Sequence, residues 1–201
     1  MGALVGVVRT RVGYAGGTEA EPTYRRVCGN PAWADWVETV QLEYDPRKIS
    51  YEEVLDAFFR NHNSWQGQRA SRSRQYQSVI FAHDEVQRDF AIRAIRARDR
   101  CGTLLESYTA FWDAEAYHQK WLLQRKAPLF MSLGLKEPSE LFTSRAAVQL
   151  NAFAARRLRP ETAARRLSLL ADEGEIDPQA LPAILDTMAE FSDEPIVMYG
   201  Q

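Results

Sequence analysis

Apolar and polar residues alternate in two stretches near the N-terminus, and each stretch predicts a strand. β-branched residues gather from Val7 to Val12, after which the chain breaks at a glycine cluster between Gly13 and Gly17. In the second stretch, 37–44, Val40, Leu42 and Tyr44 share one face and Thr39, Gln41 and Glu43 the other. Glycine adopts backbone angles that other residues cannot reach, so the cluster predicts a tightly shaped loop. Such a loop on a rigid sheet commonly carries a functional site, but a simple hairpin connection explains the cluster equally well.

Helical periodicity and capping signals predict the remaining elements. Ser50 and Glu53 form a capping box before an apolar stripe that closes near Asn61. We also expect strands at 77–82 and 104–111, helices from Asp84 to about Arg100 and from Asp113 to Leu122, and C-terminal helices within 139–159, 160–171 and 177–191. This order predicts an α+β fold with helices packed on one antiparallel or mixed sheet. Composition shifts after Met131, which predicts a helical extension over 132–201 following a domain at 1–131.

Composition narrows the class of protein. The chain has 201 residues, 45% apolar and 26% charged, with a net charge of -2 and two cysteines. These values fit a soluble domain with an appendage in a reducing, cytoplasmic compartment, without a nucleic-acid or membrane partner. The histidines lack ligand spacing, so we expect no metal and no cofactor. Several arginines are expected to form a solvated helix face and not a binding surface: Arg69, Arg72, Arg74, Arg88, Arg93, Arg96, Arg98 and Arg100.

Seven collinear segments resemble the type A methionine sulfoxide reductases. The resemblance runs from about residue 4 to 130 and is carried by GVVRTRVGYAGG (6–17), PTY (22–24), VCG (27–29), YDPRKISYEEVLDAFF (44–59), NH (61–62), SRQYQSVIF (73–81) and AEAYHQKWL (114–122). It implies a ferredoxin-like α/β roll, which is a two-layer sandwich on a mixed sheet. We therefore expect that architecture, followed by the helical extension.

The resemblance also implies a reaction. The family reduces methionine-S-sulfoxide, free or in peptides, to methionine, a repair of oxidative damage. A thiolate attacks the sulfur, an acid and two tyrosines hydrogen-bond the oxygen, and thioredoxin reduces the resulting disulfide. Carried onto this chain, the oxygen-binding tyrosines are Tyr24 and Tyr76, and the acid is Asp35 where the family has glutamate. Trp33 stands in place of a family histidine at the substrate site, and Ser71 in place of an aspartate.

The family's nucleophilic cysteine belongs to a GCFWG motif that this chain does not contain. Cys28 matches a family cysteine with another role and is expected to be buried, whereas Cys101 is expected at a helix C-terminus, where the dipole opposes a thiolate. We expect the strand and helix around the missing motif to be absent, which would expose a sheet edge and apolar faces.

Three hypotheses remain open, and whether this chain is an enzyme is therefore uncertain. The first is a reductase with a truncated N-terminus and impaired activity. The second is a non-catalytic relative with a degenerate site that binds methionine-containing peptides or another protein. The third is an interaction protein built on the C-terminal helices.

Overall fold

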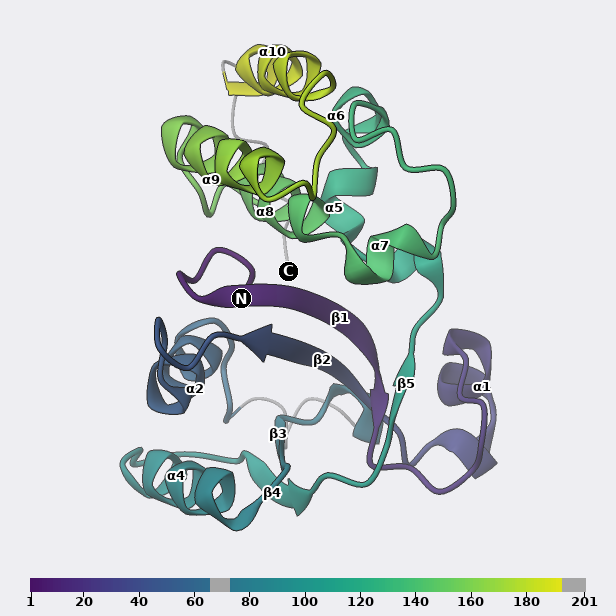
Figure 1. The fold of residues 1–201 in the computed structure, drawn as a ribbon. Coiled ribbons are helices and arrows are strands. Elements are labelled where there is room, and N and C mark those ends of the chain that lie inside the picture. The colour runs from purple at the N-terminus through teal and green to yellow at the C-terminus, as the bar shows by residue number, and fades with distance from the viewer. Residues whose placement is uncertain (66–72, 193–201) are drawn as a thin grey trace. The chain divides into compact units, whose positions relative to one another are not determined.

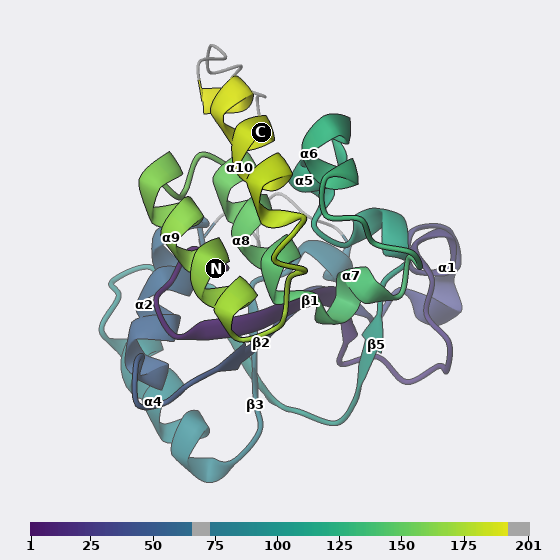
Figure 2. The same cartoon turned by 45° about the horizontal axis from the view of Figure 1, so that its top comes forward.

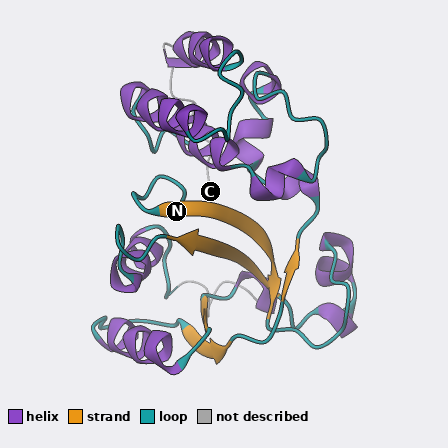
Figure 3. Cartoon of the chain, viewed as in Figure 1, coloured by secondary structure: helices purple, strands orange, loops and turns teal. Residues whose placement is uncertain are grey.

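The chain folds into two compact units, as seen in a computed structural model that describes residues 1–65 and 73–192 (Figure 1). The N-terminal unit comprises Met1 and Ala3–Gln119, and the C-terminal unit comprises Gly2 and the chain from Lys120. All described strands belong to the first unit, and the described part of the second is helical (Figure 3). The predicted α+β class with a C-terminal helical extension is confirmed.

Two small sheets form the N-terminal unit. The first is antiparallel, in the order β2-β1-β5, and is built from β1 (Val7–Ala15), β2 (Val37–Tyr44) and β5 (Phe111–Asp113). The second pairs β3 (Val79–Ala82) in parallel with β4 (Leu104–Ser107), and α4 (Glu85–Arg96) connects the two strands. Antiparallel and parallel pairs are thus both present, in separate sheets instead of the single sheet expected.

Local signals placed several elements correctly. Strand β2 spans the predicted residues, and α2 (Tyr51–Arg60) begins at a complete capping box between Ser50 and Glu53. Asp84 caps α4 by accepting the Gln87 backbone N–H at 2.7 Å. The two helix caps are made by residues three positions apart, so the local pattern alone was sufficient to predict them.

The predicted strand 104–111 is two strands in two sheets. β4 pairs with β3, and the Tyr108 N–H extends this pairing by donating to the Ala82 carbonyl oxygen. β5 then pairs with β1 in the other sheet. Asp113 was expected to cap a helix, but it lies in β5 and forms an ion pair with Arg11. Short apolar strands carry no signal for which partner they pair with, and this explains the difference.

Gly13 was expected to end the first strand but lies inside it, paired with both Thr39 and Asp113. A Cβ at this position would lie 2.1 Å from the Trp112 carbonyl oxygen. The missing side chain therefore lets β5 approach β1, and the strand continues to Ala15.

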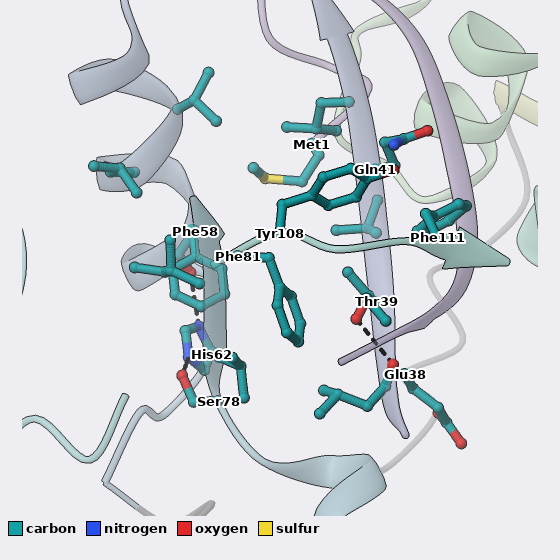
Figure 4. A pocket seen from close by; sticks show the side chains of 18 of the residues that line it. Met1, Glu38, Thr39, Gln41, Phe58, His62, Ser78, Phe81, Tyr108 and Phe111 are labelled. Atoms are coloured by element: carbon teal, nitrogen blue, oxygen red, sulfur yellow. Dashed lines mark hydrogen bonds between the residues drawn. The ribbon is translucent and has the colours of Figure 1, made fainter. Parts of the chain in front are cut away.

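A cavity of about 820 Å³ lies in the N-terminal unit along β2, whose second edge is unpaired among the described strands (Figure 4). Its aromatic lining includes Phe58, Phe81, Tyr108 and Phe111. Val40 on the strand is 41% exposed. The apolar cavity thus lies beside the edge strand of the first sheet.

The C-terminal unit is helical, and Figure 2 gives a second view of it. Its helices are α5 (Trp121–Gln124), α6 (Ala127–Met131), α7 (Glu140–Thr143), α8 (Arg145–Ala154), α9 (Pro160–Asp172) and α10 (Leu181–Ser192). Leu123, Leu150, Leu167 and Ile184 are fully buried in its core. Residues 120–131 pack with these later helices, and the proposed division of the chain between residues 131 and 132 stays a prediction.

Candidate active site

Helix α1 (Tyr24–Gly29) carries the first predicted tyrosine. Thr23 caps it, with its hydroxyl oxygen accepting the Arg26 backbone N–H at 3.3 Å. Val27 packs into a small core with Tyr14, and this anchors one face of the helix. Cys28 follows on another face and is exposed, so its predicted burial was wrong. A six-residue helix with a single buried side chain leaves the rest of its surface in water.

Glu115 fixes the start of this helix. One carboxylate oxygen accepts the Tyr24 backbone N–H at 3.0 Å, and the other accepts the Tyr14 hydroxyl at 3.3 Å. Burial raises the pKa of Tyr14, and the charge of Glu115 raises it further. Tyr14 therefore stays a hydrogen-bond donor, and Glu115 joins β1 to the helix.

A short 3-10 helix, η2 (Arg74–Tyr76), carries the second predicted tyrosine. Arg74 holds this segment: its Nε donates to the Asp35 carbonyl at 2.6 Å, and its Nη2 lies 2.8 Å from a Glu106 carboxylate oxygen. The next residue, Gln75, is buried, and its Nε2 lies 3.5 Å from the Cys28 sulfur. These contacts bring η2 to α1.

Tyr24 and Tyr76 accordingly lie close together. The pKa of Tyr24 is raised chiefly by negative charge on Cys28 and by its hydrogen bond to that sulfur, and then by Tyr76. The two side chains are 41% and 56% exposed, so a solute can reach both hydroxyls. The His118 ring lies 5.1 Å from the Tyr24 ring, centroid to centroid. The structure thus groups the two tyrosines with a thiol, and their roles stay predictions.

Asp35 and Trp33 are engaged by the glycine loop. One Asp35 carboxylate oxygen accepts both the backbone N–H and the hydroxyl of Thr18, at 2.9 and 2.8 Å. The Trp33 indole N–H donates to the Ala20 carbonyl at 2.9 Å, and Arg26 lies over its ring. Both side chains therefore brace residues 18–20, and their predicted catalytic and substrate-binding roles stay untested.

Glu38 is an acid at this site that our sequence reasoning missed. It lies opposite Tyr14 in the β1–β2 ladder, and its charge adds to the rise in the pKa of both Tyr14 and Tyr24. Partial burial raises the pKa of Glu38 itself. In Figure 4 its carboxyl points away from the aromatic centre of the cavity. The signal was available, because Glu38 is in phase with the apolar face of its strand.

The other histidine of a family-like segment has a structural role. His62 Nδ1 lies 2.8 Å from the Phe58 carbonyl oxygen, and its Nε2 lies 2.7 Å from the Ser78 hydroxyl (Figure 4). A carbonyl can only accept, so Nδ1 carries the proton and Nε2 accepts from Ser78. Both nitrogens are thus used within the fold.

The remaining candidates lie away from the tyrosines or outside the described residues. Cys101 is partly buried in the coil before β4, five residues beyond α4 and not at a helix C-terminus as expected. Arg98 lies just beyond α4, pairs with Asp56 of α2 and lies over the Phe59 ring, and the predicted solvated helix face of arginines stays a prediction. Ser71, Arg69 and Arg72 lie outside the described residues.

The chain is thus an α+β domain in which two tyrosines lie near an exposed thiol. The sequence profile of the peptide methionine sulfoxide reductase family matches residues 1–147, and the chain belongs to this family.

Named relatives agree with this membership. Peptide methionine sulfoxide reductase A5 of Oryza sativa subsp. japonica is 39% identical over 169 residues, covering 80% of this chain and 64% of that protein. Peptide methionine sulfoxide reductase of Drosophila melanogaster is 41% identical over 160 residues, covering 77% of this chain and 61% of that protein. The matched part of the chain thus spans less than two thirds of the length of these relatives.

A solved structure of methionine sulfoxide reductase A of Corynebacterium diphtheriae aligns at 26% identity with a TM-score of 0.49, covering 62% of this chain and 66% of that one. None of the helices in 1–65 and 73–192 has the length and apolar character needed to cross a membrane.

Proposed function

We propose that this protein reduces methionine-S-sulfoxide, free or in peptides, to methionine at the expense of thiols or thioredoxin. Family membership supports the reaction class. The observation that carries the assignment to this site is the grouping of Tyr24 with Tyr76 beside Cys28. Repair of oxidised proteins under oxidative stress in the cytoplasm is the role we propose for this reaction.

In the proposed mechanism the hydroxyls of Tyr24 and Tyr76 donate hydrogen bonds to the sulfoxide oxygen. Both are reachable from solvent, and the raised pKa of Tyr24 keeps its proton on oxygen. As the sulfur–oxygen bond breaks, that oxygen gains negative charge, which a nearby donor stabilises.

We assign the proton-donating acid to Glu38 in preference to Asp35. Both hydrogen bonds from Thr18 go to Oδ2 of Asp35, which gives this carboxylate a structural role in holding the glycine loop. Glu38 lies beside Tyr14 and near Tyr24, and partial burial raises its pKa, which favours the protonated form that the step needs. Asp35 is then a positioning residue for the loop.

The proposed reaction needs a nucleophilic thiol, and Cys28 is poorly suited to this role. The chain's two cysteines are Cys28 and Cys101, and of these Cys28 lies at the tyrosines. Cys28 occupies the last turn of α1, where the helix dipole does not favour a thiolate. Its sulfur also interacts with the Tyr24 hydroxyl, which would otherwise be available to hydrogen-bond the sulfoxide oxygen. We therefore propose that the chain as given binds sulfoxide but turns it over poorly.

The alternative is a non-catalytic relative that binds methionine-containing peptides or another protein. The engagement of Asp35 by Thr18 and of Tyr24 by Cys28 favours it, because both groups are held by the fold itself. In this case the tyrosines would bind a peptide without reducing it.

The test compares both epimers of N-acetyl-methionine sulfoxide with the 201-residue chain. Binding is followed by calorimetry, and turnover is followed with dithiothreitol as reductant. We expect binding of the S epimer in preference to the R epimer, and turnover well below the range of typical enzymes.

Tyr24→Phe and Tyr76→Phe should each weaken S-sulfoxide binding by about tenfold, the effect of one lost hydrogen bond. Tyr108→Phe is the control for loss of a tyrosine hydroxyl, because that ring stacks on His83. Equal binding of both epimers, or binding unchanged by both tyrosine variants, would refute the proposal. Stereoselective binding with no detectable turnover would support the non-catalytic alternative.

A further inference from the structure

Gln75 presents a buried amide to an exposed thiol. The residue is 5% exposed, and its Nε2 lies 3.5 Å from the Cys28 sulfur. Its Oε1 is also buried and accepts no hydrogen bond from any residue within the described part of the chain. Buried amide oxygens are nearly always paired, so an unpaired one beside a reactive atom calls for an explanation.

The sulfur of Cys28 is surrounded by polar groups yet open to water. Tyr24 hydrogen-bonds it on one side and the Gln75 amide on another, while Cys28 itself is exposed. An exposed sulfur is accessible to small oxidants, whereas a buried one is shielded from them. The amide of a buried glutamine thus contacts a sulfur that a small molecule can reach from solvent.

We propose that Cys28 is a site of reversible oxidation to a sulfenic acid. The oxidant is a hydroperoxide: its terminal oxygen forms a bond to the sulfur, the oxygen–oxygen bond breaks, and the thiol proton leaves with the departing hydroxyl as water or alcohol. Sulfur is oxidised by two electrons and the peroxide is reduced by two.

The two neighbours of Cys28 fit the product. The sulfenic O–H is a donor, and Gln75 Oε1 is an acceptor for which residues 1–65 and 73–192 provide no hydrogen-bond partner. The sulfenic oxygen can accept from the Tyr24 hydroxyl, which already faces the sulfur. The thiol is restored by two small-molecule thiols, the first forming a mixed disulfide with release of water and the second releasing the thiol as a new disulfide forms.

Oxidation would also control the site described above, and this consequence rests on the proposed function. Tyr24 cannot donate to a sulfenic oxygen and to a sulfoxide oxygen with the same proton. The oxidised chain should therefore bind methionine-S-sulfoxide more weakly than the reduced chain.

The experiment treats the full chain with hydrogen peroxide in the presence of a 1,3-dicarbonyl probe that labels sulfenic acids. Peptide mass spectrometry then compares Cys28 with Cys101, which is the internal control because it is partly buried. We expect Cys28 to be labelled about tenfold more than Cys101, since exposure governs the access of the oxidant to sulfur. Equal labelling, or preference for Cys101, would overturn the proposal.

Two variants test the role of the neighbours. Gln75→Leu removes the amide and should shorten the lifetime of the sulfenic acid, seen as less label when the probe is added after the peroxide is quenched. If this buried substitution prevents folding, Tyr24→Phe at the exposed neighbour gives the same readout. A lifetime unchanged in a folded variant would contradict the assignment. Labelling uses no sulfoxide, so its outcome is separate from any failure of the proposed reductase activity.

Discussion

The carboxylate of Glu115 accepts the backbone N–H of Tyr24 at 3.0 Å, across 91 residues of sequence. Its second oxygen accepts a hydrogen bond from the hydroxyl of the buried Tyr14 at 3.3 Å. One side chain thus satisfies a donor at the start of α1 and a donor inside the core. The position of the proposed sulfoxide-binding tyrosine depends on this link.

Replacing Glu115 by Ala should lower the free energy of unfolding by about 1–3 kcal/mol, because the buried Tyr14 hydroxyl loses its acceptor. The pKa of Tyr14 should fall as well, since Glu115 is the second cause of its rise after burial. Urea denaturation and tyrosinate absorbance measure the two effects. Glu115→Gln keeps the acceptor and should lose less stability; equal losses in both variants would contradict this account.

Glu38 predicts a pH dependence with a definite sign. Partial burial raises the pKa of Glu38 in the folded protein above its ordinary value. The stability that the protonated side chain contributes is therefore fully present below the unfolded pKa, and it is lost as pH rises through the folded pKa. Glu38→Gln should therefore raise the urea midpoint at pH 8 and change it little at pH 4. A midpoint lowered at pH 8 would show that the ionised carboxylate is the stabilising form.

Gly13 should not tolerate a side chain. A Cβ there would lie 2.1 Å from the Trp112 carbonyl oxygen and 2.5 Å from the Phe111 ring, so Gly13→Ala must push β5 away from β1. We expect a loss of about 1–3 kcal/mol of unfolding free energy, the usual range for overpacking.

Gly29→Ala is the control for this variant, because no heavy atom lies within 4 Å of a Cβ built at that position. It should be neutral or slightly stabilising, since alanine favours a helix more than glycine does. Thermal unfolding of both variants decides the comparison, and similar midpoints would count against the packing account.

Gln119 completes the pairing of β1 beyond the end of β5. Its buried amide accepts the Val12 N–H at 3.0 Å and donates to the carbonyls of Val12 and Ala114 at 2.7 and 3.0 Å. Gln119→Leu keeps much of the volume but leaves three backbone groups without this partner.

The expected loss in Gln119→Leu is about 2–4 kcal/mol of unfolding free energy, given the cost of unpaired buried groups. Gln179→Leu at an exposed glutamine is the control and should stay within about 0.5 kcal/mol of the parent. Hydrogen exchange of the Val12 amide adds a local readout. A stable Gln119→Leu chain with a protected Val12 amide would show that another group replaces the side chain.

The sequence determined the elements whose interactions are local. Alternation defined β2 over 37–44, and the Ser50–Glu53 capping box defined the start of α2, because each pattern is complete within a few neighbouring residues. The resemblance to a known family named Tyr24 and Tyr76, and the structure brings these two side chains together.

Only the tertiary structure decided which distant residues meet. The β1–β2 register sets Glu38 opposite Tyr14, and the docking of Val27 into the core leaves Cys28 facing water beside Gln75. Such contacts join segments tens of residues apart, and they depend on pairing register and on which helix face is buried. Neither quantity is encoded in a short window of sequence, so the position of Glu38 beside Tyr14 and the exposure of Cys28 were decided by the folded chain.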